Sequence, residues 1–169
     1  MLIALVGYMG SGKTTVGQLL ANRLNIPCID LDSEIEKREG KLISEIFRTQ
    51  GESEFRRIES AVLQNILDEF ATGIIATGGG TPCFFNQMQE LNERCVTVYL
   101  ECSANTLAAR LSTSTQNRPM LSLIHDIDTH LQDRLPCYLS AHHIVSGEMA
   151  IEDLLVRIER IWEENNPEL

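Results

Sequence analysis

The residues Gly7-Tyr8-Met9-Gly10-Ser11-Gly12-Lys13-Thr14 form a G-x-x-x-x-G-K-[ST] phosphate-binding motif near the start of the chain. The apolar run Leu2-Ile3-Ala4-Leu5-Val6 precedes it, and segment 15–24 follows with apolar residues at helical spacing. A strand, a glycine-rich loop and a helix in this order are the context in which the motif binds phosphate. The alternative, a glycine turn with a chance lysine, leaves the full spacing and the flanking segments unexplained.

Each residue type in this loop has a chemical reason. Glycines let consecutive backbone N–H groups turn toward a polyphosphate, and the N-terminus of the following helix adds partial positive charge. We expect Lys13 to neutralise the β and γ phosphates and the Thr14 hydroxyl to ligate Mg²⁺. The residues predicted to contact the nucleotide here are Gly10, Ser11, Gly12, Lys13, Thr14 and Thr15.

Composition favours one domain spanning residues 1–169 and excludes several classes of protein. Hydrophobic residues make up 43% and charged residues 22%, as in globular proteins, and no apolar run is long enough to span a membrane. The net charge of -10 argues against a nucleic-acid surface, since phosphate backbones favour clustered Lys and Arg. We expect a monomer without a nucleic-acid or membrane partner.

The five cysteines are odd in number and have no C-x-x-C spacing, so they predict buried thiols rather than metal ligands. No signal peptide precedes Met1, which together with the cysteines predicts a location in the reducing cytoplasm.

Two acids, Asp30 and Asp32, follow the apolar segment 26–29, at the point where a strand ends and a helix begins. The carboxyl ends of strands in an open α/β sheet are where ligands bind, so both acids are expected beside the phosphate-binding loop. Asp32 could instead be the N-cap of a helix over 33–39, and Asp30 a turn residue.

A short helix over 41–48, bounded by Gly40 and Gly51, is predicted to precede a longer helix over 54–70. On the longer helix, Arg56 and Glu59 project within the apolar arc, whereas Arg57 projects away from it. A charge on a buried face is costly unless it is paired or meets a ligand. Arg56 is therefore a candidate ligand-binding residue, with a purely structural Arg56–Glu59 pair as the alternative.

The predicted strand 73–77 ends in Gly78-Gly79-Gly80, where the backbone can approach something that a side chain would obstruct. Its position at the ligand-binding edge favours a substrate wall over a flexible turn. No carboxylate ends this strand, so Asp30 is the best candidate for the second metal-organising group, acting through water.

Segment 112–124 follows a predicted strand over 96–100 and a helix over 104–111 that contains Arg110. The segment is polar and lacks apolar periodicity, which is typical of a lid that closes over nucleotide and excludes water. Arg118 within it could reach the transferring phosphoryl group, or could be a solvated loop residue.

The helix predicted over 126–139 places Arg134 at the edge of its apolar face, and Pro136 is expected to kink or interrupt it. A fifth strand over 143–145 and an amphipathic helix from Ile151 to Trp162 complete the chain. The four histidines show no metal-binding spacing and are interpreted as surface or packing residues.

Six motifs occur in order along the chain. They are Gly-x-Met-Gly-Ser-Gly-Lys-Thr-Thr at 7–15, Asp-x-Asp at 30–32, Glu-Ile-Phe-x-x-x-Gly-Glu-x-x-Phe-Arg-x-x-Glu at 45–59, Thr-Gly-Gly-Gly at 77–80, Arg-Pro-Met-Leu at 118–121 and Arg-x-Pro-x-Tyr at 134–138. This order resembles the shikimate kinase family over nearly the whole chain. The first motif is shared by many nucleotide-binding families, whereas the run 45–59 combined with Thr-Gly-Gly-Gly is specific.

The resemblance implies an α/β P-loop fold like that of the nucleoside monophosphate kinases, a three-layer arrangement with a five-stranded parallel sheet, a mobile lid at about 112–124 and a substrate-binding helical region at about 32–60. It also implies ATP-dependent phosphorylation of the 3-hydroxyl of shikimate, in the route to aromatic amino acids. Met120 replaces the usual leucine, and segment 146–149 departs from the family pattern near the adenine, so its contacts stay unassigned.

Individual roles follow from the resemblance. Asp32 matches the acid that binds substrate hydroxyls and is a candidate base, and Arg56 and Arg134 match the arginines of the shikimate carboxylate. Gly79, flanked by Gly78 and Gly80, matches a substrate-contacting glycine, and Glu59 a supporting acid. Arg118 matches the lid arginine at ATP, and Arg110 a nucleotide-side residue.

The leading hypothesis is in-line phosphoryl transfer from MgATP, in which positioning and charge stabilisation provide most of the catalysis. Its catalytic residues are Asp32, Lys13 and Arg118, with Thr14 and Asp30 organising the metal. A kinase for another small hydroxy acid such as gluconate is one alternative, and a catalytically inactive nucleotide-binding regulatory module is the other.

Overall fold

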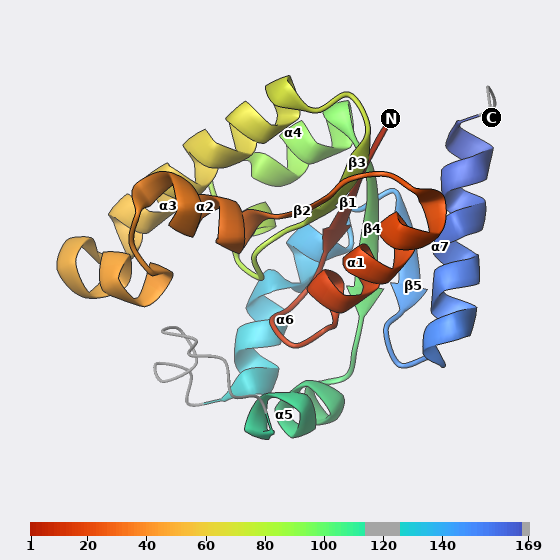
Figure 1. Ribbon diagram of the computed structural model, residues 1–169. Helices are drawn as coiled ribbons and strands as arrows, with labels where there is room; N and C mark the ends of the chain where they lie inside the picture. The colour runs from red at the N-terminus through yellow and green to blue at the C-terminus, as the bar shows by residue number, and fades with distance from the viewer. Residues whose placement is uncertain (114–125, 167–169) are drawn as a thin grey trace.

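The computed structural model describes residues 1–113 and 126–166 (Figure 1). Its five strands are β1 (Leu2–Val6), β2 (Cys28–Asp30), β3 (Gly73–Ala76), β4 (Val96–Glu101) and β5 (His143–Ser146). They form one five-stranded parallel sheet, as the resemblance implied, and the strand order is β2-β3-β1-β4-β5. In the central strand, Leu5 pairs with Ala76 on one side and with Val98 on the other.

Helices cover both faces of the sheet and make three layers (Figure 1). They are α1 (Lys13–Leu24), α2 (Leu31–Glu39), α3 (Ile43–Glu69), the short 3₁₀ helix η1 (Thr81–Cys83), α4 (Gln87–Arg94), α5 (Ala104–Ser112), α6 (Ile127–Tyr138) and α7 (Ile151–Asn165). Within the described ranges, no helix is both long and apolar enough to cross a lipid bilayer.

The central strand β1 shows why the sheet is buried on both faces. Ala4 and Val6 pack into the apolar cluster beneath α3, α4 and α6, whereas Ile3 and Leu5 pack on the opposite side with α1 and α7. Successive side chains of a strand point to opposite faces, so a strand covered on both sides needs a continuous apolar run. Trp162 of α7 is 1% exposed and is part of the apolar cluster that Ile3 and Leu5 form with α1 and α7.

The break predicted between helices 41–48 and 54–70 is present inside α3. The helix α3 extends from Ile43 to Glu69, but within it Gly51 has a φ of 81° and a ψ of 173°, outside the helical range. The backbone therefore turns at Gly51 and changes the direction of α3 before the segment that carries Arg56.

The expected interruption at Pro136 does not occur, because α6 continues through this residue to Tyr138. Proline removes one backbone N–H donor from a helix. Here the helix ends only two residues later, and the N–H of the capping Leu139 bonds the carbonyl of Leu135. The predicted interruption was wrong, since a proline in the last turn of a helix disturbs few of its hydrogen bonds; the alternative, a kink, stays a prediction.

All five strands point the same way, so their carboxyl ends lie along one edge of the sheet. The segments that leave this edge include the loop after β1, Asp30 at the end of β2 and residues 77–80 after β3. Ligands of open parallel sheets bind at this edge. The fold therefore gathers the motifs of the sequence on one side of the molecule.

Replacing Gly51 by alanine should lower the free energy of unfolding by about 1–3 kcal/mol, because its φ and ψ lie in a region that side-chain-bearing residues rarely adopt. Apart from the adjoining backbone, no atom lies within 4 Å of the position of the added Cβ, so the expected effect comes from backbone strain and not from a steric clash. Urea unfolding measures it. As a control, replacing the nearby exposed Ser53 by alanine should change the free energy of unfolding by less than about 0.5 kcal/mol. An equal effect of both substitutions would contradict the role of backbone strain at Gly51.

Candidate functional site

A cleft of about 1070 Å³ opens at the carboxyl edge of the sheet. Its walls come from the loop after β1, from α1, α2, α3, α5 and α6, and from residues 77–80. Every predicted site residue in the described part of the chain lines it: Gly10, Ser11, Gly12, Lys13, Thr14, Thr15, Asp30, Asp32, Arg56, Glu59, Gly78, Gly79, Gly80, Arg110 and Arg134. Arg118, and the predicted lid from residue 114 onward, lie outside the described residues.

The phosphate-binding loop has a backbone that only glycine adopts easily. Gly10 and Gly12 have φ values of 83° and 100°, and α1 begins directly after Gly12, at Lys13. Lys13 is 7% exposed, and its Nζ donates to the carbonyls of Gly7 at 2.8 Å and Tyr8 at 2.9 Å. The loop thus holds a buried ammonium group beside the N-terminus of a helix, which suits a polyphosphate.

Thr14 and Asp30 come together across the loop, although the chain separates them by 16 residues. The Thr14 hydroxyl donates to Asp30 Oδ2 at 2.7 Å. Asp30 Oδ1 accepts from the backbone N–H of Ser33 at 3.0 Å, so Asp30 is the N-cap of α2. The hydroxyl and carboxylate oxygens form a pair of the hard donors that Mg²⁺ prefers.

The N-cap role considered for Asp32 therefore belongs to Asp30. The helix begins at Leu31, two residues earlier than predicted, and Asp32 lies exposed in its first turn. In this position the Asp32 carboxylate lies near the carboxyl end of β3, since a Cβ built on Gly78 would be 3.2 Å from Asp32 Oδ1.

Arg56 is buried on α3 and is held by acids of its own helix. It is 5% exposed, and its Nη1 donates to Oε2 of the 1%-exposed Glu59 at 2.9 Å. Its Nη2 donates to Glu52 Oε1 at 3.1 Å, and Thr81 donates to the second oxygen of Glu59 at 2.6 Å. Arg57 points to solvent with a 70%-exposed side chain, as the helix geometry predicted.

The Arg56–Glu59 pair exists, but it does not use all the donors of the guanidinium. Nε also donates to Glu52, so these contacts engage three of the five N–H groups that an arginine carries. The guanidinium carbon lies 4.3 Å from the centre of the Phe84 ring. A rigid, partly satisfied fork of this kind can bind a carboxylate in the cleft.

The three glycines after β3 leave space that other residues of the site occupy. A Cβ at Gly80 would lie 2.6 Å from Arg56 Nη2, and one at Gly78 would lie 2.9 Å from Glu59 Oε1. A Cβ at Gly79 would lie 2.9 Å from the backbone nitrogen of Met9. The sequence correctly predicted a close approach, and the groups that approach include side chains of α3 and the phosphate-binding loop.

Arg110 connects three segments at the nucleotide side of the cleft. Its guanidinium donates to the carbonyl of Gly147 at 2.9 Å and to that of Ser11 at 3.3 Å. Next to Gly147, hydrogen bonds from the side chains of Thr106 and Ser103 hold the pKa of Glu148 at about 2. These contacts fix the unassigned segment 146–149 beside the phosphate-binding loop.

Two side chains near Arg134 were not predicted as site residues from the sequence. His130, one helical turn earlier, contacts the Arg134 guanidinium through Nε2 and the Tyr8 hydroxyl through Nδ1. The spacing of four residues between His130 and Arg134 was the available signal, because such residues are neighbours on a helix. No local pattern pointed to Tyr8.

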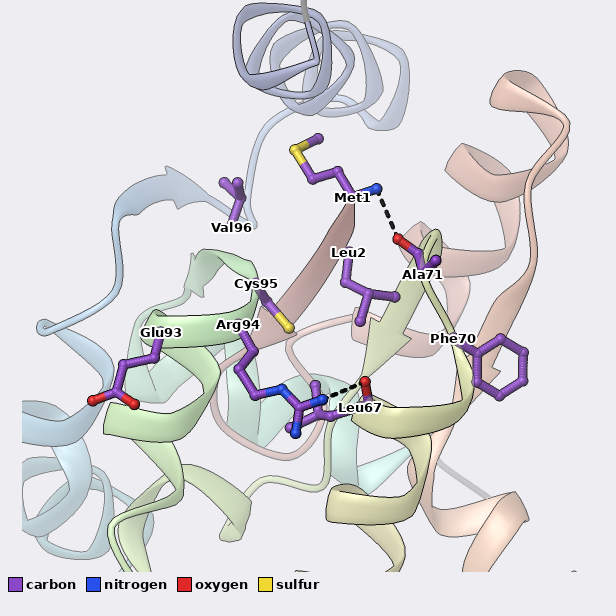
Figure 2. A pocket seen from close by; sticks show the side chains of 9 residues that line it. All are labelled: Met1, Leu2, Leu67, Phe70, Ala71, Glu93, Arg94, Cys95 and Val96. Carbon is purple, nitrogen blue, oxygen red and sulfur yellow. Dashed lines mark hydrogen bonds between the residues drawn. The ribbon is translucent and has the colours of Figure 1, made fainter.

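A second hollow of about 450 Å³ lies at the opposite edge of the sheet, where β1 and β4 begin (Figure 2). Arg94 in its wall donates to the carbonyl of Leu67 at 2.6 Å and pairs with Asp68. The α-ammonium of Met1 bonds the carbonyl of Ala71 (Figure 2). The charged groups of Met1 and Arg94 are thus bonded to adjacent parts of the same chain. In the larger cleft, by contrast, charged side chains from several elements face one space.

Known proteins match this arrangement over most of the chain. The sequence profile of the shikimate kinase family matches residues 9–159. A shikimate kinase from Bacteroides fragilis is 43% identical over 152 residues, which cover 86% of this chain and 84% of the relative.

Solved structures agree. The shikimate kinase of Bacteroides thetaiotaomicron has a TM-score of 0.87 at 37% identity, with 96% of this chain and 98% of that chain covered. That of Acinetobacter baumannii, solved in complex with shikimate, has a TM-score of 0.86 at 34% identity and coverages of 97% and 93%. With a family match over residues 9–159 and these relatives over most of its length, this chain belongs to the shikimate kinase family.

Proposed function

We propose that this chain transfers the γ-phosphoryl group of ATP to the 3-hydroxyl of shikimate, giving shikimate 3-phosphate and ADP. The observation that carries the proposal is the single cleft in which the phosphate-binding loop faces Asp32, Arg56 and Arg134. The family match and the relative solved with shikimate support the choice of acceptor. The cationic groups suit an acceptor that carries a carboxylate, and the acid suits one that carries hydroxyl groups.

On the donor side, the loop 10–15 and Arg110 would bind the phosphates. Lys13 would move its ammonium from the loop carbonyls to the β and γ phosphates, where it compensates charge in the transition state. Arg118 would add a second positive charge from the predicted lid at 112–124, and water exclusion by the lid would strengthen both contributions.

The Thr14–Asp30 pair fits a magnesium site, with Thr14 as direct ligand and Asp30 acting through water. Mg²⁺ prefers oxygen ligands and keeps several waters, so few protein groups suffice. A magnesium ion held by these two residues would supply positive charge that offsets the charge of the nucleotide phosphates. The N-cap bond from Ser33 fixes the orientation of the Asp30 carboxylate.

On the acceptor side, the substrate-binding region at about 32–60 would orient shikimate. Arg56 and Arg134 would hold its carboxylate, with Glu59 keeping Arg56 in place and Gly78, Gly79 and Gly80 leaving room at the wall. Asp32 would accept a hydrogen bond from the reacting hydroxyl and could take its proton. Fixing the carboxylate selects which hydroxyl faces ATP, and correct orientation lowers the barrier by several kcal/mol.

A coupled assay of ADP release tests the function. Turnover should require shikimate and should be negligible with gluconate, the representative of other small hydroxy acids. Comparable turnover with gluconate would favour the alternative kinase, and no turnover with either acceptor would favour a regulatory nucleotide-binding module. The monomeric state and the cytoplasmic location stay predictions, checked by light scattering and by fractionation.

Replacing Asp32 by asparagine should lower kcat about 10²- to 10⁴-fold, because the amide keeps the shape but cannot accept a proton. ATP affinity, measured by calorimetry, should stay unchanged. The control is Asp153→Asn in the first turn of α7, an exposed acid outside the cleft. Near-normal turnover of Asp32→Asn would remove Asp32 from catalysis.

Replacing Arg56 by lysine should raise the KM for shikimate roughly tenfold to a hundredfold, since one ammonium cannot reproduce a bidentate contact. Arg57→Lys is a matched control on the same helix, because Arg57 points to solvent. Steady-state kinetics at saturating ATP measure both. If KM and kcat of Arg56→Lys match the wild type, Arg56 does not bind the carboxylate.

Replacing Thr14 by valine should raise the Mg²⁺ concentration that gives half-maximal ADP release by roughly tenfold, because it removes a metal-ligating hydroxyl while keeping the side-chain shape. Titrating Mg²⁺ at fixed ATP measures the change, and excess EDTA should abolish turnover of the wild type. An unaltered Mg²⁺ dependence would exclude Thr14 as a ligand.

A further inference from the structure

His130 links Arg134 of the acceptor side to the phosphate-binding loop. Arg134 Nη1 contacts His130 Nε2 within α6, and His130 Nδ1 lies 2.6 Å from the hydroxyl of Tyr8. The two rings meet edge to face, with centroids 5.5 Å apart and planes at 82°. Tyr8 is 1% exposed, and its backbone carbonyl accepts from the N–H of Ser11 at 3.1 Å, so its position is fixed within the loop.

These contacts determine where the imidazole carries its proton. Arginine has only donors, so Nε2 of His130 must accept the hydrogen bond from Arg134. In a neutral ring the proton then lies on Nδ1, which donates to the Tyr8 oxygen. A protonated ring would place an N–H⁺ against the guanidinium and could not accept from it.

The two acceptor-side arginines are held in different ways. Arg56 is bonded to the carboxylates of Glu52 and Glu59, which offset much of its charge. Arg134 is bonded instead to a neutral ring, which orients the guanidinium and leaves its full charge available to an anion. The imidazole is therefore suited to direct Arg134 without weakening its attraction for a carboxylate.

Burial and the charge of Arg134 favour the neutral form of His130, against the opposing effect of two nearby acids. Arg134 and Asp133 face it from α6, Glu52 and Arg56 face it from α3, and Tyr8 faces it from the loop. Burial, followed by the charge of Arg134, lowers the pKa of His130 below its usual 6.5. The ring thus gains its proton only as the pH falls below about 6.5.

We propose that His130, supported by Tyr8, is a positioning residue that holds Arg134 toward the acceptor and ties it to the phosphate-binding loop. This role rests on the proposed function, in which Arg134 binds the acceptor carboxylate. Protonation of His130 breaks its contact with Arg134 and weakens binding of the acceptor. The KM for shikimate therefore rises as the pH falls below about 6.5, whereas the KM for ATP does not follow this change.

Steady-state kinetics between about pH 5.5 and 8 test the role with two variants. His130→Gln keeps an acceptor for Arg134 and a donor for Tyr8 but cannot titrate, so its KM for shikimate should be close to that of the wild type near pH 8 and independent of pH. His130→Phe keeps an aromatic ring but accepts no hydrogen bond, so its KM for shikimate should be raised about 5- to 20-fold throughout. His143→Gln, on β5 and outside the cleft, should keep the wild-type profile, although the pKa of His143 is also lowered by burial.

Two kinetic results would overturn the proposal. An unchanged KM in His130→Phe would show that Arg134 needs no support from the imidazole. A KM that falls at low pH in the wild type but not in His130→Gln would show that the imidazolium binds the carboxylate itself.

A measurement without turnover separates this proposal from the proposed function. Long-range ¹H–¹⁵N spectra of the wild type should show His130 as the neutral Nδ1–H tautomer at pH 7, and Tyr8→Phe should reduce its population. An Nε2–H tautomer would contradict the Arg134 contact. If the wild type released no ADP with shikimate while the Nδ1–H tautomer was found, the proposed function would fail and the link between Tyr8, His130 and Arg134 would stand.

Discussion

The buried ion pair of Arg56 and Glu59 is the interaction on which the acceptor half of the cleft depends. Both side chains are almost fully removed from water, which costs several kcal/mol per charge unless the geometry is good. Thr81 donates to the second oxygen of Glu59, and Gly78 and Gly80 lack the Cβ atoms that would collide with the pair. Removing Arg56 would leave the buried Glu59 without this cationic partner, whereas removing Glu59 would leave Arg56 with the half-exposed Glu52.

The parallel sheet explains why this pair lies next to the nucleotide site. With every strand pointing the same way, the loop after β1, the end of β2 and the glycines after β3 meet at one edge, and α2 and α3 carry the acids and Arg56 across it. The turn at Gly51 redirects α3 just before Arg56. Donor and acceptor groups are thereby held on rigid elements, which favours a reaction that depends on positioning.

Local sequence patterns predicted some residues of the site correctly and others only in part. Helical periodicity separated the buried Arg56 from the exposed Arg57, because an amphipathic helix has one apolar side. Periodicity placed the start of α2 two residues too late, since helix ends depend on individual hydrogen bonds that periodicity does not encode. Pro136 was expected to kink or interrupt α6, and the interruption does not occur. The roles of Arg118 and of the lid stay predictions.

By itself, the sequence determined the phosphate-binding loop, the five strands and the buried face of α3, because each is a local pattern of residue types. Only the tertiary structure decided what the three glycines make room for, and that Asp30 joins Thr14. It alone placed Tyr8 against His130, 122 residues away. Contacts between distant segments follow from how helices pack on the sheet, which no local spacing records.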